Sequence, residues 1–186
     1  MSSISNFKDS FNGGTRENRF VVNGTFPSTG SVQQPGQTNL ISKFHVSATQ
    51  IPTLTTMVME YNFFGRKYYY PGEKQYGSWS LRILDDTGTN DMWKKFSNWS
   101  NFINNHQTNV SQPSVRYKAD WEVQQLDLNG TEPLKRFVLQ GCWPKIIEPI
   151  AFNMANPNTL NQFAVVMIYD IVRIYTGENK EITETL

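Results

Sequence analysis

The fold is decided by the stretch after Pro113, which reads Val-Arg-Tyr-Lys-Ala-Asp-Trp-Glu-Val-Gln over residues 115–124. Apolar and charged side chains alternate along it, and this is the clearest period of two in the chain. Successive side chains of a β-strand point to opposite faces of a sheet, so one face of this stretch is apolar and the other is charged. The pattern predicts a strand with one buried face from Val115 to Val123.

Working outward, the sequence predicts several more strands. Asn129-Gly130 is typical of a hairpin turn and indicates a partner strand through Phe137–Leu139, which the run Gly141-Cys142-Trp143-Pro144 is expected to break. The last strand, 162–175, is apolar on both faces, which indicates burial inside its own domain and beneath a neighbouring subunit. Alternating or apolar patterns predict the remaining strands at residues 44–48, 55–64 and 79–83.

One segment has helical periodicity. Its apolar side chains recur at i, i+4, i+7 and i+11, as Met92, Phe96, Trp99 and Ile103. Thr89 or Asn90 is expected to cap the helix, and Asp91 suits the positive end of its dipole. The chain is therefore expected to be mainly β, of the α+β type: an antiparallel β barrel or sandwich flanked by one α-helix at about residues 91–104, with long loops and extended termini.

The length of 186 residues predicts a single domain over residues 1–186, and 38% hydrophobic residues supply a core. The start of the chain has no long apolar run, which indicates no signal peptide and a cytosol-like compartment. The longest apolar stretch, 163–169, is too short to cross a bilayer, so no membrane anchoring is expected. Four segments are expected to lie outside the regular elements: an N-terminal arm (1–20), a long loop (23–38), an inter-subunit loop (65–77) and a C-terminal tail (176–186).

Candidate catalytic and metal-binding residues are few. A net charge of +1 gives no field for holding nucleic acid. Nucleophilic catalysis needs a nucleophile beside a base, and zinc needs clustered His or Cys; neither pattern occurs. The residues that could carry chemistry are His45, His106, Cys142, Asp85 and Asp86. A structural role is favoured for each of them, and no catalytic, metal-binding or cofactor-binding role is assigned. The sequence thus favours binding or scaffolding over catalysis, with a β-barrel enzyme kept as the alternative from another class.

Three consecutive tyrosines, Tyr68–Tyr70, follow Arg66 and Lys67. They cannot all point into one core, so part of their aromatic surface is exposed unless a partner covers it. One interpretation is that Arg66, Lys67 and the tyrosines stack nucleic-acid bases along a groove. An interface loop is the favoured one.

Together these landmarks resemble the tail tube protein of contractile-tailed bacteriophages. The resemblance covers roughly residues 40–175 and depends on the order of its parts rather than on one motif. Those parts are Ala48-Thr49-Gln50-Ile51-Pro52, Phe64-Gly65-Arg66-Lys67 with Pro71-Gly72, Trp79 to Asp86, the helix with Phe96 and Trp99, Gly141-Cys142-Trp143-Pro144 and the closing strand Phe163–Tyr169.

The resemblance implies a β barrel flanked by one helix, six copies per ring, and rings stacked into a tube inside a contractile sheath. It implies self-association as the main contact, with the tail sheath, the baseplate or tube initiator, the tail terminator, the tape measure protein and genomic DNA in the lumen as partners, and no cofactor. It places the protein in the virion after assembly in the host cytoplasm. A tube-initiating baseplate protein and a type VI or phage-like injection-system tube share the architecture and stay open as alternatives.

Ten residues follow as candidates for these contacts. Inter-subunit or stacking contacts are expected at Arg66, Tyr68, Tyr69, Tyr70, Phe163 and Val166. The charged face of the strand 115–123 is expected to face the lumen through Arg116, Lys118, Asp120 and Glu122. The resemblance further implies a net negative lumen, which points to Asp120 and Glu122 as the groups nearest DNA.

Overall fold

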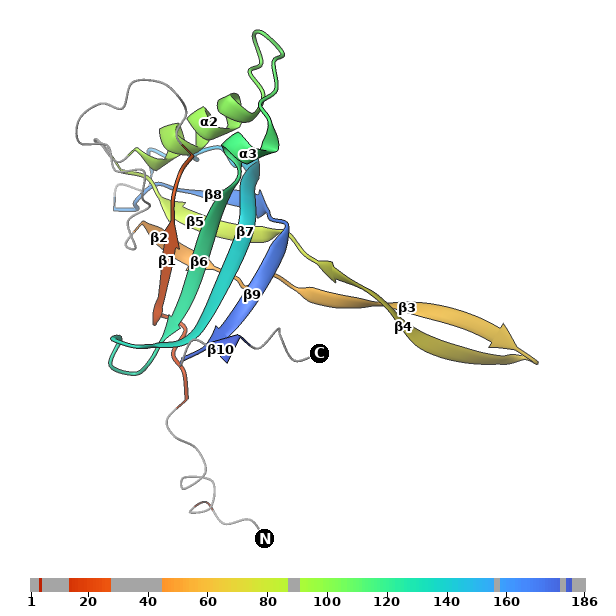
Figure 1. The fold of residues 1–186 in the computed structure, drawn as a ribbon. Coiled ribbons are helices and arrows are strands. Elements are labelled where there is room, and N and C mark those ends of the chain that lie inside the picture. Colours follow the sequence, from red (N-terminus) through yellow and green to blue (C-terminus); the bar gives the residue numbers. More distant parts are fainter. Residues whose placement is uncertain are drawn as a thin grey trace.

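The structure is a computed structural model that describes residues 4, 14–27, 45–86, 91–155, 158–177 and 180–181. The expected Thr89 or Asn90 cap, Phe44 and most of the 1–20 arm, the 23–38 loop and the 176–186 tail lie outside these residues. Figure 1 shows a β-sandwich with a helix across one end and a long hairpin projecting from its side.

The described elements are mainly strands. The first half contains β1 (Phe20–Gly24), β2 (Val46–Thr49), β3 (Leu54–Phe63), β4 (Arg66–Tyr76), β5 (Trp79–Leu84) and α2 (Met92–Ile103). The second half contains α3 (Ser114–Tyr117), β6 (Ala119–Leu126), β7 (Pro133–Ile147), β8 (Gln162–Ile168), β9 (Ile171–Thr176) and β10 (Lys180–Glu181).

Two antiparallel sheets share one strand. The first half of β7 lies between β6 and β9, and β1 pairs with the other side of β6. The second half of β7 pairs with β8, which continues to β5 and β2. β1 and β2 end this order without pairing with each other, so the structure is an open sandwich rather than a closed barrel.

Gly141 is the point at which β7 passes from one sheet to the other. It has a positive φ of 70°, a conformation that glycine adopts without strain. The register also shifts between Ala119 and Trp121 opposite this point, as at a β-bulge. The expected break at residues 141–144 is therefore wrong: the strand bends there and continues to Ile147.

The same corner divides the last predicted strand. Residues 162–175 form two strands, β8 and β9, because the chain turns at Tyr169-Asp170 to join the other sheet. In β8 the side chains alternate between a fully buried face and a half-buried face. The predicted burial inside the domain is confirmed for one face of β8, whereas the single continuous strand is wrong.

Aromatic rings fill the centre of the sandwich. Trp121 lies 5.9 Å from Trp79, 5.9 Å from Phe96 and 6.2 Å from Trp99, measured between ring centroids. Phe96 and Trp99 come from α2, so the helix closes one end of the core. Burial of such large rings supplies most of the hydrophobic stabilisation at this end.

Helix α2 confirms the predicted 91–104 segment to within a residue or so at each end. Its N-cap is Asp91, whose carboxylate accepts a hydrogen bond from the Lys94 amide at 2.8 Å. Asp91 is thus a capping side chain and not only a charge near the dipole. The buried stripe is Met92, Phe96 and Trp99.

The strand predicted from Val115 begins later than expected. Ser114–Tyr117 form the short helix α3, and strand β6 starts at Ala119. The indole of Trp99 donates a 2.7 Å hydrogen bond to the Tyr117 carbonyl oxygen, which ties this turn to α2. Tertiary contact therefore overrides the alternating pattern over its first four residues, 115–118.

Candidate assembly surfaces

Strands β3 and β4 form a hairpin that leaves the sandwich (Figure 1). Its turn is Phe64-Gly65, with φ values of 46° and 76°, as a two-residue hairpin turn requires. All ten residues of β3 are exposed. The segment 65–77, expected to be an inter-subunit loop in the form of a turn-bearing loop or a loose hairpin, is the returning strand of a hairpin.

The hairpin has one apolar face. Tyr61 lies opposite Tyr68, and Met59 lies opposite Tyr70, so their side chains share a face. Each side chain on it is about half exposed, and together they form the apolar face of the hairpin: Met57, Met59, Tyr61, Phe63, Tyr68 and Tyr70. Exposed hydrophobic side chains gathered on one face in this way are typical of interaction sites on folded proteins.

The opposite face of the hairpin carries its charged residues beside the exposed Val58, and is called the polar face below. Glu60 and Lys67 form an ion pair of 2.6 Å across the two strands, beside Asn62. Tyr69 lies on this face, opposite Glu60. The three tyrosines that sequence analysis grouped together are thus divided, with Tyr68 and Tyr70 on the apolar face and Tyr69 on the polar one.

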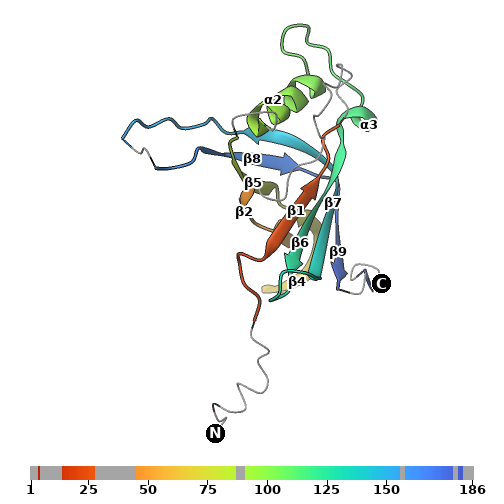
Figure 2. The ribbon, with the colours of Figure 1, turned by 90° about the vertical axis from the view of Figure 1, so that its left-hand side faces the viewer.

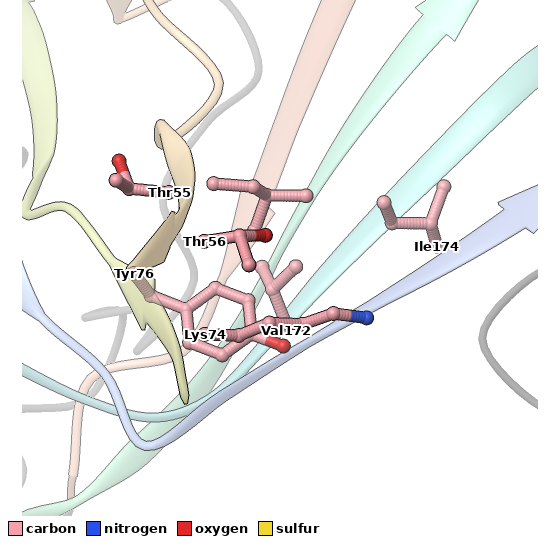
Figure 3. A pocket seen from close by; sticks show the side chains of 7 residues that line it. Thr55, Thr56, Lys74, Tyr76, Val172 and Ile174 are labelled. Carbon is pink, nitrogen blue, oxygen red and sulfur yellow. The ribbon is translucent and has the colours of Figure 1, made fainter. Parts of the chain in front are cut away.

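The base of the hairpin is fixed to the sandwich. The Tyr169 hydroxyl donates a 2.7 Å hydrogen bond to the Gly77 carbonyl oxygen, and the Tyr76 ring lies 6.3 Å from the Tyr169 ring. Burial raises the pKa of Tyr169 to about 12, so the hydroxyl keeps its proton. A pocket of about 250 Å³ lies between the base and β9 and is lined by Leu54 together with the residues labelled in Figure 3: Thr55, Thr56, Lys74, Tyr76, Val172 and Ile174.

The outer face of the β1-β6-β7-β9 sheet carries paired charges. Arg136 Nε donates to Glu122 Oε1 at 2.5 Å, and Gln124 donates to the same oxygen at 2.7 Å. The guanidinium of Arg136 also lies 5.8 Å from the centre of the Tyr175 ring. Two of the predicted lumen candidates, Asp120 and Glu122, lie on this face of β6.

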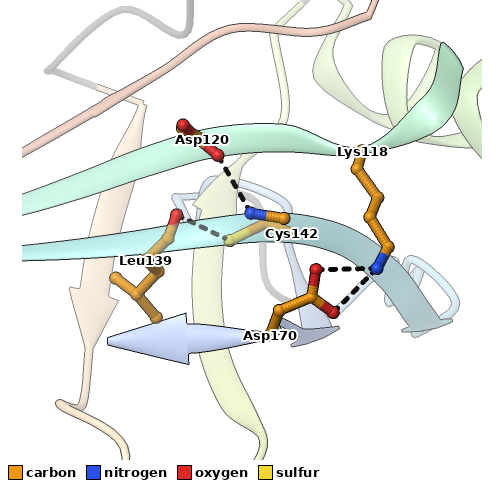
Figure 4. Close-up of polar contacts among 6 residues, drawn as sticks. Lys118, Asp120, Leu139, Cys142 and Asp170 are labelled. Atoms are coloured by element: carbon orange, nitrogen blue, oxygen red, sulfur yellow. Dashed lines mark hydrogen bonds and ion pairs between the residues drawn. The ribbon is translucent and has the colours of Figure 1, made fainter. Parts of the chain in front are cut away.

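The charges continue to the sheet corner, drawn in Figure 4. Lys118 Nζ lies 2.7 Å from both carboxylate oxygens of Asp170, and Asp120 accepts a 2.9 Å hydrogen bond from the Gly141 amide. The structure thus places three of the four lumen candidates together. The fourth, Arg116, lies on α3.

Arg66, another stacking candidate, begins β4 opposite Phe63, and the remaining two candidates lie on β8. Phe163 is 2% exposed and points into its own core. Val166 points to the other side of the strand and is half-buried. Both edges of β8 are paired, to β5 and β7, so only its outer face is available to another subunit.

Sequence analysis missed one exposed segment and one set of contacts. The β7–β8 connection, residues 148–161, exposes Phe152, Met154 and Leu160, which no periodic pattern distinguished. The partners of the charged strand, Arg136 and Asp170, come from strands whose register the sequence did not specify. The run 149–161, which contains no charged residue, was the available signal for the connection.

Two of the residues weighed for chemistry, His45 and Asp86, come into contact in the structure. His45 Nε2 lies 3.5 Å from Asp86, and Cys142 is fully buried. Burial raises the pKa of the Cys142 thiol far above its usual value. Among the described residues, no three His, Cys, Asp or Glu side chains are grouped to hold a metal ion. Nor does any helix in this part of the chain have the length and apolarity to cross a membrane.

Comparison with known proteins places this fold in a family. A tail tube protein of Serratia phage KSP90 is 23% identical over 173 residues, which cover 91% of this chain and 95% of that protein. A chain in the sheath–tube complex of an extracellular contractile injection system, solved in its extended state, shares the fold at a TM-score of 0.63 and 18% identity, covering 95% of this chain and 99% of that one. A chain in the sheath/tube terminator structure of such a system gives a TM-score of 0.64 and 17% identity, covering 90% of this chain and 100% of that one. The family model for phage tail tube proteins matches residues 15–174, and the chain belongs to that family.

Proposed function

We propose that this tail tube protein forms hexameric rings that stack into the inner tube of a contractile tail and conduct the genome into the host. The observation that carries the proposal is the exposed apolar face of the β3–β4 hairpin, on a chain of the tail tube family. The role is structural and not enzymatic. The partners are further copies of the chain, the sheath, the baseplate or tube initiator, the terminator and the tape measure protein, with assembly in the host cytoplasm before incorporation in the virion.

Open sheet edges support ring formation. Among the described residues, β1 pairs only with β6, and β2 pairs only with β5, so each has a free edge. Free edges pair with other strands unless something covers them. Strand pairing between neighbouring copies would close the ring and remove these edges.

The outer face of the β1-β6-β7-β9 sheet is proposed as the lumen wall. Lys118 and Glu122 form ion pairs there, so their charges are balanced at short range, and Asp120 accepts a hydrogen bond from the Gly141 amide. Such charges cancel beyond a Debye length of about 8–10 Å. The lumen wall is then hydrated but does not bind the phosphate groups of DNA.

Electron microscopy of the concentrated protein tests the assembly, with two neighbouring tyrosines as matched variants. Tyr70→Asp places a charge on the apolar face of the hairpin, and Tyr69→Asp places the same charge on the polar face. We expect wild type and Tyr69→Asp to form tubes, and Tyr70→Asp to stay as folded rings or monomers. Featureless particles from the wild-type protein, or normal tubes from Tyr70→Asp, would contradict the proposal.

DNA release from particles tests the lumen. Asn23 is exposed on β1, faces outward and pairs with Glu122 across the strands, so Asn23→Lys adds a cation to the proposed wall without removing a contact the structure shows. Asn98→Lys on the exposed side of α2 is the matched control. We expect slower release only from Asn23→Lys, easing at high salt because phosphate contacts weaken with ionic strength. Equal rates of DNA release from both variants, with tails intact, would show that this sheet does not line the lumen.

A second candidate function is the tube of an injection system. It is favoured by the fold shared with the extracellular contractile injection system at a TM-score of 0.63. Purified particles distinguish the two, because a phage tail attaches to a DNA-filled head and an injection system does not. Particles without a head or DNA would support the second candidate.

A further inference from the structure

A second apolar projection leaves the sandwich besides the hairpin. It is the β7–β8 connection, which the structure describes at residues 148–155 and 158–161, and Figure 2 shows it extending beyond the sheets. Phe152 is 82% exposed, Leu160 is 71% exposed and Met154 is fully exposed. Glu148, at its base, is the only charged residue in the connection.

We propose that the β7–β8 connection of one copy packs on the apolar face of the hairpin of a neighbouring copy. This inference rests on the proposed tube function and names the contact that the hairpin makes. The occupant of the apolar face is thus a second copy of this chain, held through Phe152, Met154 and Leu160.

The chemistry of the two surfaces matches. The apolar face of the hairpin is built of aromatic rings and methionines, and thioether groups pack favourably on aromatic rings. The connection offers a phenylalanine, a methionine and a leucine among uncharged residues, so the connection brings no charge of its own into the contact. Arg66, opposite Phe63 at the tip of the hairpin, is the charged residue on the hairpin side. The polar face of the hairpin, with the Glu60–Lys67 ion pair, has no counterpart in the connection and stays in solvent.

The arrangement of the two projections suits contact between copies. The hairpin extends to the right in Figure 1, whereas the connection extends to the left in Figure 2, which is turned by 90°. The two segments therefore leave the same subunit in different directions. A contact between different patches of identical subunits is head-to-tail and produces rings or filaments rather than closed dimers.

The area available is also adequate. The six side chains of the apolar face are 45–60% exposed. At about 200 Å² per large side chain, they offer on the order of 600 Å². A stable interface buries about 800 Å² on each partner, so this contact supplies most of one interface and leaves the strand edges to complete it.

Cysteine cross-linking tests the contact, because the native Cys142 is buried and does not react. Tyr61→Cys, on the apolar face, is combined with Met154→Cys in one chain, and Asn62→Cys with Met154→Cys is the matched control on the polar face. Mild oxidation of assembled tubes should link chains into a ladder of multimers for the first pair and leave the second unlinked. No ladder in intact tubes, or equal ladders from both pairs, would overturn the inference.

Methionine oxidation tests the contact in the unaltered protein, should a double variant fail to fold. Met59 and Met154 are exposed, whereas Met92 and Met167 are 0% exposed and serve as internal controls. With hydrogen peroxide and peptide mass spectrometry, we expect Met59 and Met154 to oxidise several-fold more slowly in tubes than in dilute free subunits. The two controls should be slow in both states.

The outcomes separate this inference from the proposed function. Tubes in which Met154 oxidises at the rate of the free subunit would overturn the contact while the tube function stands. A protected Met154 without cross-links to Tyr61→Cys would place the connection against another surface and also overturn it. Absence of tubes from the wild-type protein would contradict the proposed function itself.

Discussion

Gly24 lies directly against the indole ring of Trp121, its partner across strands β1 and β6. A Cβ atom at position 24 would overlap that ring. The ring in turn is 1% exposed and contacts rings from β5 and α2. A glycine in an outer strand thus lets the central tryptophan of the core occupy the space that a side chain would fill.

Gly24→Ala is therefore expected to destabilise the subunit by about 1–3 kcal/mol, the usual range for overpacking a core. Urea unfolding of the free subunit measures this as a lower midpoint. Gly77→Ala is the control, since a Cβ there has its nearest neighbours at 3.6 Å, an ordinary contact. Equal urea midpoints for Gly24→Ala and Gly77→Ala would show that β1 shifts away from the Trp121 ring without a cost in stability.

Alanine substitutions at two glycines with positive φ distinguish the cost of a strained backbone from the cost of a steric clash. Gly65→Ala meets no atom within 4 Å, so it should cost only the roughly 1–2 kcal/mol of a left-handed residue. Gly141→Ala has a similar φ, but its Cβ would overlap the Asp170 carboxylate. We expect the larger loss of unfolding free energy from Gly141→Ala. A loss no larger than that of Gly65→Ala would mean that the Lys118–Asp170 pair moves aside freely.

Asp127 gives the turn between β6 and β7 a pH dependence. Its carboxylate accepts a 3.0 Å hydrogen bond from the Thr131 amide, and with other amides this lowers its pKa below the ordinary 3.8. A lowered pKa in the folded state means that the contribution to stability is present above pH 3.8 and is lost as the pH falls through the folded value. Asp127→Asn should lower the urea midpoint at pH 7, and the difference should narrow below pH 3.8. A constant difference down to pH 2 would exclude this carboxylate as the cause.

The two faces of β8 should give opposite phenotypes. Phe163→Ala removes a core ring and is expected to cost about 3–5 kcal/mol of subunit stability. Val166→Asp lies on the half-buried outer face, so the subunit should fold with near-normal circular dichroism. Its tubes should vanish, because the contact with a neighbour would bury an unpaired carboxylate. Tubes at wild-type yield from Val166→Asp would show that this face meets no other subunit.

Much of the fold follows from local patterns in the sequence. Helix α2 and strand β5 were predicted within one residue or so at each end, because each has a strong period and one fully buried face. The alternation of Trp121 and Val123 also holds. Such patterns depend only on which face meets the core.

The remaining differences arise from contacts between segments distant in sequence. The turn at Ser114–Tyr117 is held by a hydrogen bond from Trp99, and the bend at Gly141 is shaped by Asp170 and Asp120. No local pattern carries that information. Only the first strand of the hairpin was predicted as a strand, and for a different reason. Exposed strands have no buried face, so the tyrosines gave no period that would distinguish the second strand from a loop.

Strand β7 also bears on how the subunit carries force. Because it belongs to both sheets, its covalent backbone joins the proposed inner wall to the layer that holds β8, β5 and β2. A load on one wall passes to the other through the peptide chain, without relying on the side chains between them to resist shear. Pulling the layers apart would require peeling hydrogen bonds one after another from β7, and the place where such peeling would start is the bend at Gly141.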